Sequence, residues 1–333
     1  LEVLCGVMEM LEQRGMREQA DAMSNSLLEI HHHLFEAREY EEADDIVNAI
    51  WEFLHMRGLR EMAKELLKKS IDSLESDNKY VAMTNLASLL NDEGKWQEAL
   101  DTHQECLEFF RSIDAKSQIA TVISQQAQIY QDRGGYEQAL RLEQKALALQ
   151  EEIGNMEDIV IPHYRIAQLL HRIEKYEEAL KHLEKGLQME RELNHPEGEA
   201  KYLHQLGLTL NSLNRPNEAF KRFSESLAIA EQIGDKAGKA DSLGMIGGLL
   251  RRAGQFKEAL DCYQQILNIH RELGDPVKVA IDLEAIGLVF EVQGHYEEAL
   301  IKYQEAQELN KQYGSPQDIA HTERNIARVK RQI

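Results

Sequence analysis

The stretch GHYEEALIKYQEA, residues 294–306, decides how the sequence is interpreted, because its opening recurs along the chain. The other copies are GKWQEAL (94–100), GGYEQAL (134–140), EKYEEAL (174–180), NRPNEAF (214–220) and GQFKEAL (254–260). Each alanine lies 40 residues from the next, without an insertion. Self-similarity at a fixed period of about 20 to 50 residues is typical of a solenoid of stacked repeats. The stretch therefore predicts a repeat array.

The adjacent carboxylates of Glu297 and Glu298 allow two interpretations, an acid–base pair or the solvated face of a helix. Glu298 precedes Lys302 by four residues, which is the favourable order for an ion pair along a helix. The equivalent carboxylates are replaced by Gln138, Asn217 and Lys257 in other copies, as a solvated face permits. The sequence favours the structural interpretation.

A second column of residues predicts a first helix in each repeat. A small residue stands twelve positions before each alanine: Ala87, Ala127, Ala167, Gly207, Gly247 and Gly287. Apolar residues at helical spacing surround it, and a small side chain lets two helices approach closely. Trp96 stands in the column of Tyr136, Tyr176, Phe256 and Tyr296, which predicts that it lies in the core.

The turns and links between helices are also regular. Each link carries a residue that tolerates a left-handed backbone: Asp114, Gly154, Asn194, Gly234, Gly274 and Gly314. The next residues include the N-cap candidates Asn155, Asp235, Asp275 and Ser315, and then the prolines Pro196, Pro276 and Pro316, which suit a first helical position. Pro162 is the exception, since it lies inside a predicted first helix and is expected to delay or kink it.

The pattern divides the chain into three parts. Residues 1–79 are divergent helical hairpins, in which RGMREQA (14–20) and RGLREMA (57–63) resemble each other. Residues 80–319 hold six regular repeats, and residues 320–333 repeat only the first-helix pattern. An end repeat has an uncovered apolar face, so the last segment is expected to be a capping helix. The prediction is an all-α fold of about eight helical hairpins.

Composition and charge limit the classes of partner. The formal net charge is −20, which repels nucleic-acid phosphate and anionic membranes. No apolar run is long enough for a transmembrane helix, and no signal peptide is recognised. Cys5, Cys106 and Cys262 are few and widely spaced, which favours a reducing, cytoplasmic location. The chain begins with Leu1 instead of methionine, so we expect a fragment or processed product, although an engineered start has the same appearance.

A search for chemistry finds no catalytic residue, no cofactor site and no metal site. The motifs of serine hydrolases, zinc proteases, phosphate loops and dinucleotide folds are all missing. His31, His32 and His33 are consecutive, and consecutive side chains on a helix point about 100° apart, so they do not converge on one ion. The sequence predicts that the protein is not an enzyme.

The small residue, the flanking apolar positions and the helix–turn–helix unit resemble the tetratricopeptide repeat family, well over residues 80–333 and weakly over residues 1–79. The 40-residue unit, as in ELGDPVKVAIDLEAIGLVF (272–290), is similar to that of the Pins-like adaptors and of bacterial signalling (STAND-type) proteins. The resemblance implies a right-handed superhelix whose concave groove is lined by first helices and binds proteins or peptides. The lysine clamp and the recurrent asparagines of known ligand classes are missing.

Polar residues on the expected groove face are the candidate partner-binding site: Asn91, Gln128, Gln131, Tyr164, Gln168, His171, Arg172, His204, Asn211, Arg251 and Arg252. Amide side chains suit hydrogen bonds to an extended peptide, and the arginines suit an acidic or polar segment, which could belong to the same polypeptide. The alternative is that these residues form an ordinary solvated helix face.

The leading prediction for function is a non-enzymatic protein-interaction scaffold. The alternative is the sensor or regulatory arm of a larger signalling or defence protein, STAND- or protease-linked, whose effector domain lies outside this chain.

Overall fold

The computed structural model describes residues 17–333, and every regular element in that range is an α-helix. The helices are α2 (Arg17–Glu36), α3 (Tyr40–Met56), α4 (Arg60–Ser73), α5 (Asn78–Asp92), α6 (Trp96–Ser112), α7 (Lys116–Asp132), α8 (Tyr136–Ile153), α9 (Met156–Arg172), α10 (Tyr176–Leu193), α11 (Pro196–Ser212), α12 (Pro216–Ile233), α13 (Lys236–Arg252), α14 (Phe256–Leu273), α15 (Pro276–Val292), α16 (Tyr296–Tyr313) and α17 (Pro316–Val329).

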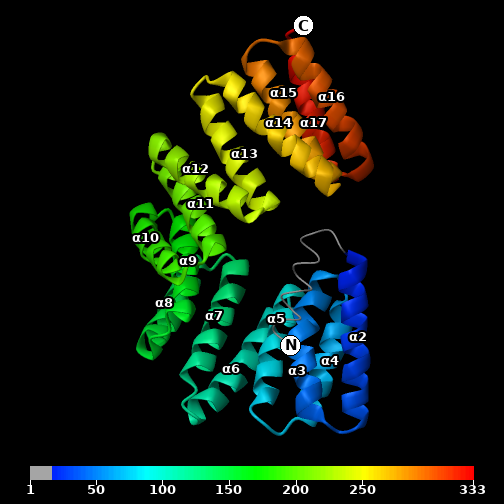
Figure 1. Ribbon diagram of the computed structural model, residues 1–333, viewed down its shortest axis with the longest axis vertical. Coiled ribbons are helices and arrows are strands. Elements are labelled where there is room, and N and C mark those ends of the chain that lie inside the picture. Colours follow the sequence, from blue (N-terminus) through cyan, green and yellow to red (C-terminus); the bar gives the residue numbers. More distant parts are fainter. Residues whose placement is uncertain (1–16) are drawn as a thin grey trace. The chain divides into compact units, whose positions relative to one another are not determined.

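The helices alternate along the chain between first and second members of antiparallel hairpins (Figure 1). The pairs run from α3/α4 to α15/α16, with α2 before them and α17 after them. The predicted all-α array of hairpins is therefore confirmed for the described residues. The fold divides into two compact units, Leu1–Leu169 and Leu170–Ile333. None of the described helices combines the length and the apolar composition needed to cross a bilayer.

The helix ends follow the predicted chemistry. Asp235 and Asp275 each accept a hydrogen bond from the backbone three residues later, and Ser315 forms a capping box with Asp318. Pro196, Pro276 and Pro316 are the first residues of their helices, as predicted. The link residues from Asp114 to Gly274 have positive φ, as do the turn residues Glu174 and Asn214, which replace glycine.

Two details differ from the prediction. Gly314 has φ −84° and ψ 169°, which is extended instead of left-handed, because the link before α17 continues directly into the extended N-cap Ser315. Pro162 does not delay its helix, since α9 begins at Met156 and continues through Pro162. Pro162 cannot donate to the carbonyl of Asp158 and its ring crowds that carbonyl, but the helix continues on both sides of it.

Close packing between the two helices of a hairpin explains the small-residue column. A Cβ atom added to Gly207 would lie 2.6 Å from the ring of Phe223, and one added to Gly287 would lie 2.8 Å from Tyr303. Both rings are buried, and each lies on the second helix of the same hairpin, sixteen residues after its glycine. Only a residue without a side chain allows an aromatic ring to pack against the first helix at this distance.

The hairpins with alanine in the small-residue column carry neither phenylalanine nor tyrosine opposite it. The equivalent second-helix positions hold His103 and Glu143, both almost completely buried. Glu143 accepts a hydrogen bond from Ser124 and lies 3.6 Å from Arg165, yet burial raises the pKa of its carboxyl. A methyl group on the first helix is thus matched by a side chain smaller than tyrosine on the second.

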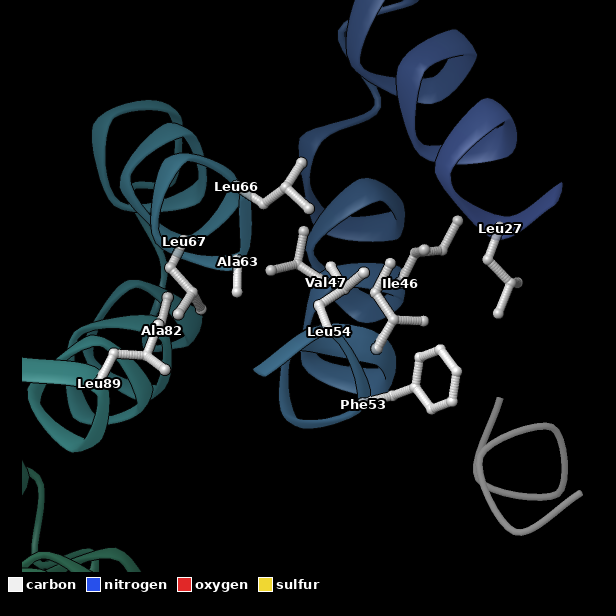
Figure 2. Close-up of a cluster of buried hydrophobic side chains, with 11 residues drawn as sticks. Leu27, Ile46, Val47, Phe53, Leu54, Ala63, Leu66, Leu67, Ala82 and Leu89 are labelled. Carbon is white, nitrogen blue, oxygen red and sulfur yellow. The ribbon is translucent and has the colours of Figure 1, made fainter. Parts of the chain in front are cut away.

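The divergent N-terminal hairpins pack in the same way. Figure 2 shows one cluster of buried apolar side chains in which α2, α3, α4 and α5 all take part. Ala63, the alanine of RGLREMA, is completely buried there, as Ala99 is in the first regular repeat. The second of the two similar segments, RGLREMA, thus forms the turn between α3 and α4 and the start of α4, whereas Cys5 and the first three residues of RGMREQA lie outside the described residues.

The last helix, α17, has a polar face where earlier first helices are apolar. Glu323 and Lys330 occupy the positions that Leu283 and Phe290 hold in α15, and both are exposed. Its other side is fixed to α15, where Glu291 accepts two hydrogen bonds from Arg328, at 2.5 and 2.7 Å. A polar outer face on a helix that docks by its inner face is the composition of a capping helix, and we propose that role for α17.

The glycine–aromatic contact predicts a position-specific effect of one methyl group. Gly207→Ala should lower the free energy of unfolding by about 1–3 kcal/mol, because the new Cβ overlaps Phe223. Gly248→Ala is the matched control, since the nearest atom to its Cβ is 3.9 Å away, and it should gain about 0.5–1 kcal/mol of helix propensity. Urea unfolding followed by circular dichroism measures both. Equal effects of the two substitutions would contradict the packing argument.

Burial of His103 predicts a loss of stability in mild acid. Thr84 and Gln125 are its polar neighbours, but neither ring nitrogen has a hydrogen bond of good geometry, and burial lowers the pKa of the imidazole to about 4. The unfolded chain protonates near pH 6.5, so it binds the proton more tightly than the native protein. The contribution of the neutral His103 to the free energy of unfolding is fully present above pH 6.5 and falls by about 3 kcal/mol on going to pH 4.

The measurement is urea unfolding between pH 4 and pH 8 for the native protein and for His103→Leu, which copies Leu183 at the equivalent position. All other titrating groups are common to both proteins and cancel in the comparison. A pH dependence of the same steepness in the variant would show that His103 is not responsible.

Candidate functional site

Polar contacts join consecutive first helices at a constant sequence separation. Asn91 on α5 donates to Asp132 on α7 at 2.6 Å, and Arg252 on α13 donates to Asn211 on α11 at 2.8 Å. His171 at the end of α9 contacts Ser212 on α11 at 3.5 Å. Each pair is 41 residues apart, one repeat plus one residue. The first helices within each unit therefore form a layer whose polar edge connects one repeat to the next.

Several of the predicted site residues meet in the unit Leu170–Ile333. His171 and Arg172 end α9, Asn211 lies near the end of α11, and Arg251 and Arg252 end α13. The contacts of His171 with Thr209, at 3.2 Å, and of Arg252 with Asn211 bring these three helix ends together. We call His171, Arg172, Arg251 and Arg252 the basic row.

No carboxylate among the described residues neutralises the arginines of the basic row. Elsewhere the exposed cations of this acidic protein are commonly paired, as Lys236 is with Glu272 at 2.8 Å. By contrast, no carboxylate in the described range lies within 4.0 Å of Arg172, Arg251 or Arg252. Burial and the charge of Arg172 lower the pKa of His171. The arginines of the basic row are therefore a concentration of positive charge without a carboxylate partner in a chain of net charge −20.

The predicted residues of the other unit are largely engaged with neighbouring side chains. Gln128 donates to Asp132 at 2.7 Å, so Asp132 accepts from both Gln128 and Asn91. Tyr164 hydrogen-bonds to Gln168 on the same helix, and burial raises the pKa of its hydroxyl. Gln131 is half-buried. An exposed polar face is present, but it is internally bonded.

His204 belongs to the packing of its hairpin as much as to the exposed face. Its ring lies 5.3 Å from that of Phe223, in an edge-on arrangement, and burial lowers the pKa of the imidazole. Sequence reasoning did not identify Asp132, Thr209 or Ser212, the residues that complete the polar contacts. Comparing each first-helix residue with the one 41 positions later would have found Asp132 and Ser212.

The prediction that Trp96 lies in the core is wrong. Its side chain is 40% exposed, whereas its equivalents Tyr136, Tyr176, Phe256 and Tyr296 are only partly exposed. Trp96 is the first residue of α6, and the group over its ring is the guanidinium of Arg133, 5.4 Å from the ring centre. A long, exposed cation covers the indole less completely than apolar side chains would.

The described residues offer little for catalysis. Cys106 and Cys262 are both buried and unpaired, and burial raises the pKa of the Cys106 thiol to about 11. A thiol that stays protonated at neutral pH is a poor nucleophile. In residues 17–333 no group of three or more His, Cys, Asp or Glu side chains has the geometry of a metal site. His31 is buried beside Phe35, whereas His32 and His33 are exposed, so the three rings have different surroundings.

The contact between Asn91 and Asp132 should couple two repeats energetically. A double-mutant cycle with Asn91→Ala and Asp132→Ala is expected to give a coupling of about 1 kcal/mol in urea unfolding, because Asn91 is buried. The control cycle uses Gln97→Ala and Asp101→Ala, an exposed amide–carboxylate pair within α6, and should give about 0.3 kcal/mol. A coupling no larger than the control would show that the polar edge does not connect the repeats.

The comparisons with known proteins agree with this architecture. A family model described as tetratricopeptide repeat matches residues 80–152, 158–232, 199–272 and 238–312, together more than half of the chain. No curated protein matches the chain in a comparison of sequences.

Three solved structures illustrate the likeness in fold. A STAND protein with a tetratricopeptide repeat sensor from Pyrococcus horikoshii has a TM-score of 0.71 at 15% identity; the match covers 92% of this chain and 48% of that chain. Yeast Tom70 has a TM-score of 0.61 at 17% identity, covering 95% and 61%. A Rap protein complexed with competence and sporulation factor has a TM-score of 0.55 at 15% identity, covering 93% and 98%.

At these identities the solved structures support the fold alone, and this chain spans about half the length of the STAND protein. The family model and the repeated helical hairpins agree with each other. Tetratricopeptide repeats are generally non-catalytic scaffolds suited to protein interaction. The chain belongs to the tetratricopeptide repeat family.

Proposed function

We propose that this protein is a non-enzymatic scaffold that binds an acidic or polar segment of a partner protein along its first helices. The observation that carries the proposal is the basic row, whose arginines have no carboxylate within 4.0 Å among the described residues. A guanidinium that no carboxylate neutralises gains most from a carboxylate, which accepts two parallel hydrogen bonds from it. The net charge of the chain is −20, so other surfaces of the protein repel an acidic segment. This repulsion favours binding of such a segment at the basic row.

Helix ends alone do not account for the basic row. Arg251 and Arg252 lie in the last turn of α13, where a cation is stabilised by the helix dipole by about 0.3–1 kcal/mol. Stabilisation by the helix dipole requires only one cation at each helix end, and it does not require contacts between side chains of different helices. The contacts of His171 with Thr209 and of Arg252 with Asn211 instead align the side chains of three successive helices. Such an alignment suits an extended segment that crosses the helices.

The amide side chains of the other unit support binding of a peptide backbone. Asn91, Gln128 and Gln131 lie near the ends of α5 and α7. The Oδ1 atom of Asn91 is buried without a hydrogen-bond donor, although its amide nitrogen donates to Asp132. Amide groups both donate and accept, as the N–H and C=O groups of an extended peptide do. Asn91 is buried and donates to Asp132, and we propose that Gln128 and Gln131 beside it hold the backbone of a partner segment.

The absence of enzymatic activity is part of the proposal. The buried thiols are kept protonated by burial, and the family generally provides binding surfaces. We also propose a cytoplasmic location, because the unpaired Cys106 and Cys262 suit a reducing compartment.

Charge reversal in the basic row tests the proposed binding. An N-acetylated, C-amidated peptide of alternating glutamate and serine serves as the probe, with affinity measured by fluorescence anisotropy at two salt concentrations. Arg251→Glu together with Arg252→Glu should weaken binding at least about tenfold, because each lost charged hydrogen bond is worth about 1.5–3 kcal/mol. The native affinity should fall as salt rises.

Lys257→Glu together with Arg271→Glu is the control, because it makes the same change in charge on α14, a second helix. It should change the affinity by less than about twofold, as expected for distant charges screened by salt. An unchanged affinity in the Arg251 and Arg252 variant would remove the basic row from the site. Equal weakening in both variants would mean that net charge alone attracts the peptide.

A second candidate function rests on the likeness to the STAND protein, which has a tetratricopeptide repeat sensor. In that case the chain is the sensor arm of a longer polypeptide, and its first helices hold a ligand or a segment of the effector domain. The Rap protein, with its bound factor, is a second neighbour of comparable fold. Sequencing the reading frame on both sides of the chain distinguishes the candidates. A nucleotide-binding or protease-like domain in the same frame supports the sensor arm, and its absence supports the free scaffold.

A further inference from the structure

Trp96 and Arg133 form an exposed stack at the turn between α5 and α6. The guanidinium of Arg133, just after α7, lies over the indole at 5.4 Å. The two side chains border a recess of about 300 Å³ that is also lined by Gly94, Lys95, Gln97 and Glu98. Tryptophan and arginine are the residue types most enriched among the side chains that dominate protein-binding energy.

The repeat fold does not require this stack. The positions equivalent to Arg133 hold Glu93, Leu213, Ala253 and Gln293 in other first helices, and none of these can place a cation over a ring. The hairpins that carry them are formed equally well. An exposed cation–aromatic contact contributes little to stability. The 40% exposure of the Trp96 side chain is therefore not offset by a comparable gain in the stability of the fold.

The two cationic side chains that line the recess differ in whether a carboxylate neutralises them. Lys95 is already paired with Glu93 at 2.7 Å, whereas Arg133 has no carboxylate within 4.0 Å in the described part of the chain. A guanidinium that stacks by one face keeps its edge N–H groups available for two parallel hydrogen bonds to a carboxylate. Glu98 supplies one negative charge to the lining, which disfavours a ligand with several adjacent carboxylates.

We propose that this recess binds a single carboxylate, flanked by an apolar side chain, on a segment of another protein. The carboxylate accepts hydrogen bonds from the edge of Arg133, and the apolar side chain packs on the uncovered part of Trp96. The carboxylate belongs to an Asp or Glu side chain of the partner segment. The site uses none of the residues of the basic row, so it stands or falls independently of the function proposed for that row.

The indole of Trp96 reports directly on the recess. The only other tryptophan, Trp51, packs beside the N-terminal core and is replaced by phenylalanine in the full chain to leave one fluorophore. Three octapeptides based on Ser-Gly-Leu-X-Ser-Gly-Ser-Leu are titrated. The first has X = Glu and an amidated terminus, the second X = Gln and a free terminus, and the third X = Gln and an amidated terminus.

A saturable change in Trp96 emission with the first peptide, but not with the third, supports the proposal. Arg133→Gln should then weaken binding at least about fivefold, since it removes the charged donor but retains a polar side chain. Arg133→Lys should weaken it as well, because an ammonium neither stacks nor donates in parallel. Gln293→Ala, at the equivalent position after α15, is the matched control and should leave the affinity unchanged.

Equal responses to all three peptides, a response to the second peptide alone, or no response to any of them would overturn the proposal. An affinity for the carboxylate peptide that survives Arg133→Gln would overturn it too. The variant with Arg251→Glu and Arg252→Glu separates the two proposals, because it should weaken binding of the glutamate–serine peptide to the basic row at least about tenfold and leave the Trp96 response intact.

Discussion

The close approach of two helices at one small residue per repeat is the constraint on which the rest of the structure depends. In three hairpins the contact joins a glycine of the first helix to a ring of the second, as for Gly207 and Phe223, Gly247 and Tyr263, and Gly287 and Tyr303. In hairpins with Ala87 and Ala127 the opposite position holds a side chain other than tyrosine or phenylalanine. The sizes on the two helices therefore compensate each other, which keeps the hairpin geometry similar from repeat to repeat. Similar hairpins can stack in a regular register.

Because the hairpins stack regularly, the side of each first helix that faces away from the packed core is not constrained by packing. The residues there differ between copies, and they connect to the next repeat by polar contacts such as that of Asn91 with Asp132. Where these contacts satisfy charge, as for Glu291 with Arg328, they fix one helix to another. Where they leave charge uncompensated, as in the basic row, the surface can attract a partner of opposite charge. Both recognition surfaces proposed for this protein arise at positions that the packing does not determine.

Most of the fold was predictable because the determining interactions are local and repeated. The caps at Asp235, Asp275 and Ser315 act within three residues, so the sequence alone identified them correctly. Predictions were wrong where one copy departs from the repeated environment. Trp96 shares a column with core aromatic residues, but a cation from the next repeat covers it, and Gly314 follows the last complete hairpin, where the link to α17 is extended. The candidate site was predicted as a set of polar positions, yet its hydrogen-bond partners depend on side chains one repeat away.

The sequence by itself determined the repeat length, the alternation of helices, the helix ends and the family, because spacing and backbone preferences are properties of short segments. The tertiary structure alone decided which polar residues face one another. It showed that Asp132 accepts hydrogen bonds from both Asn91 and Gln128, that the arginines of the basic row have no carboxylate within 4.0 Å in residues 17–333, and that Trp96 is exposed beneath Arg133. The physical reason is that hydrogen bonds and charge compensation depend on distances of a few ångströms between residues about 40 positions apart, and those distances exist only after the hairpins have stacked.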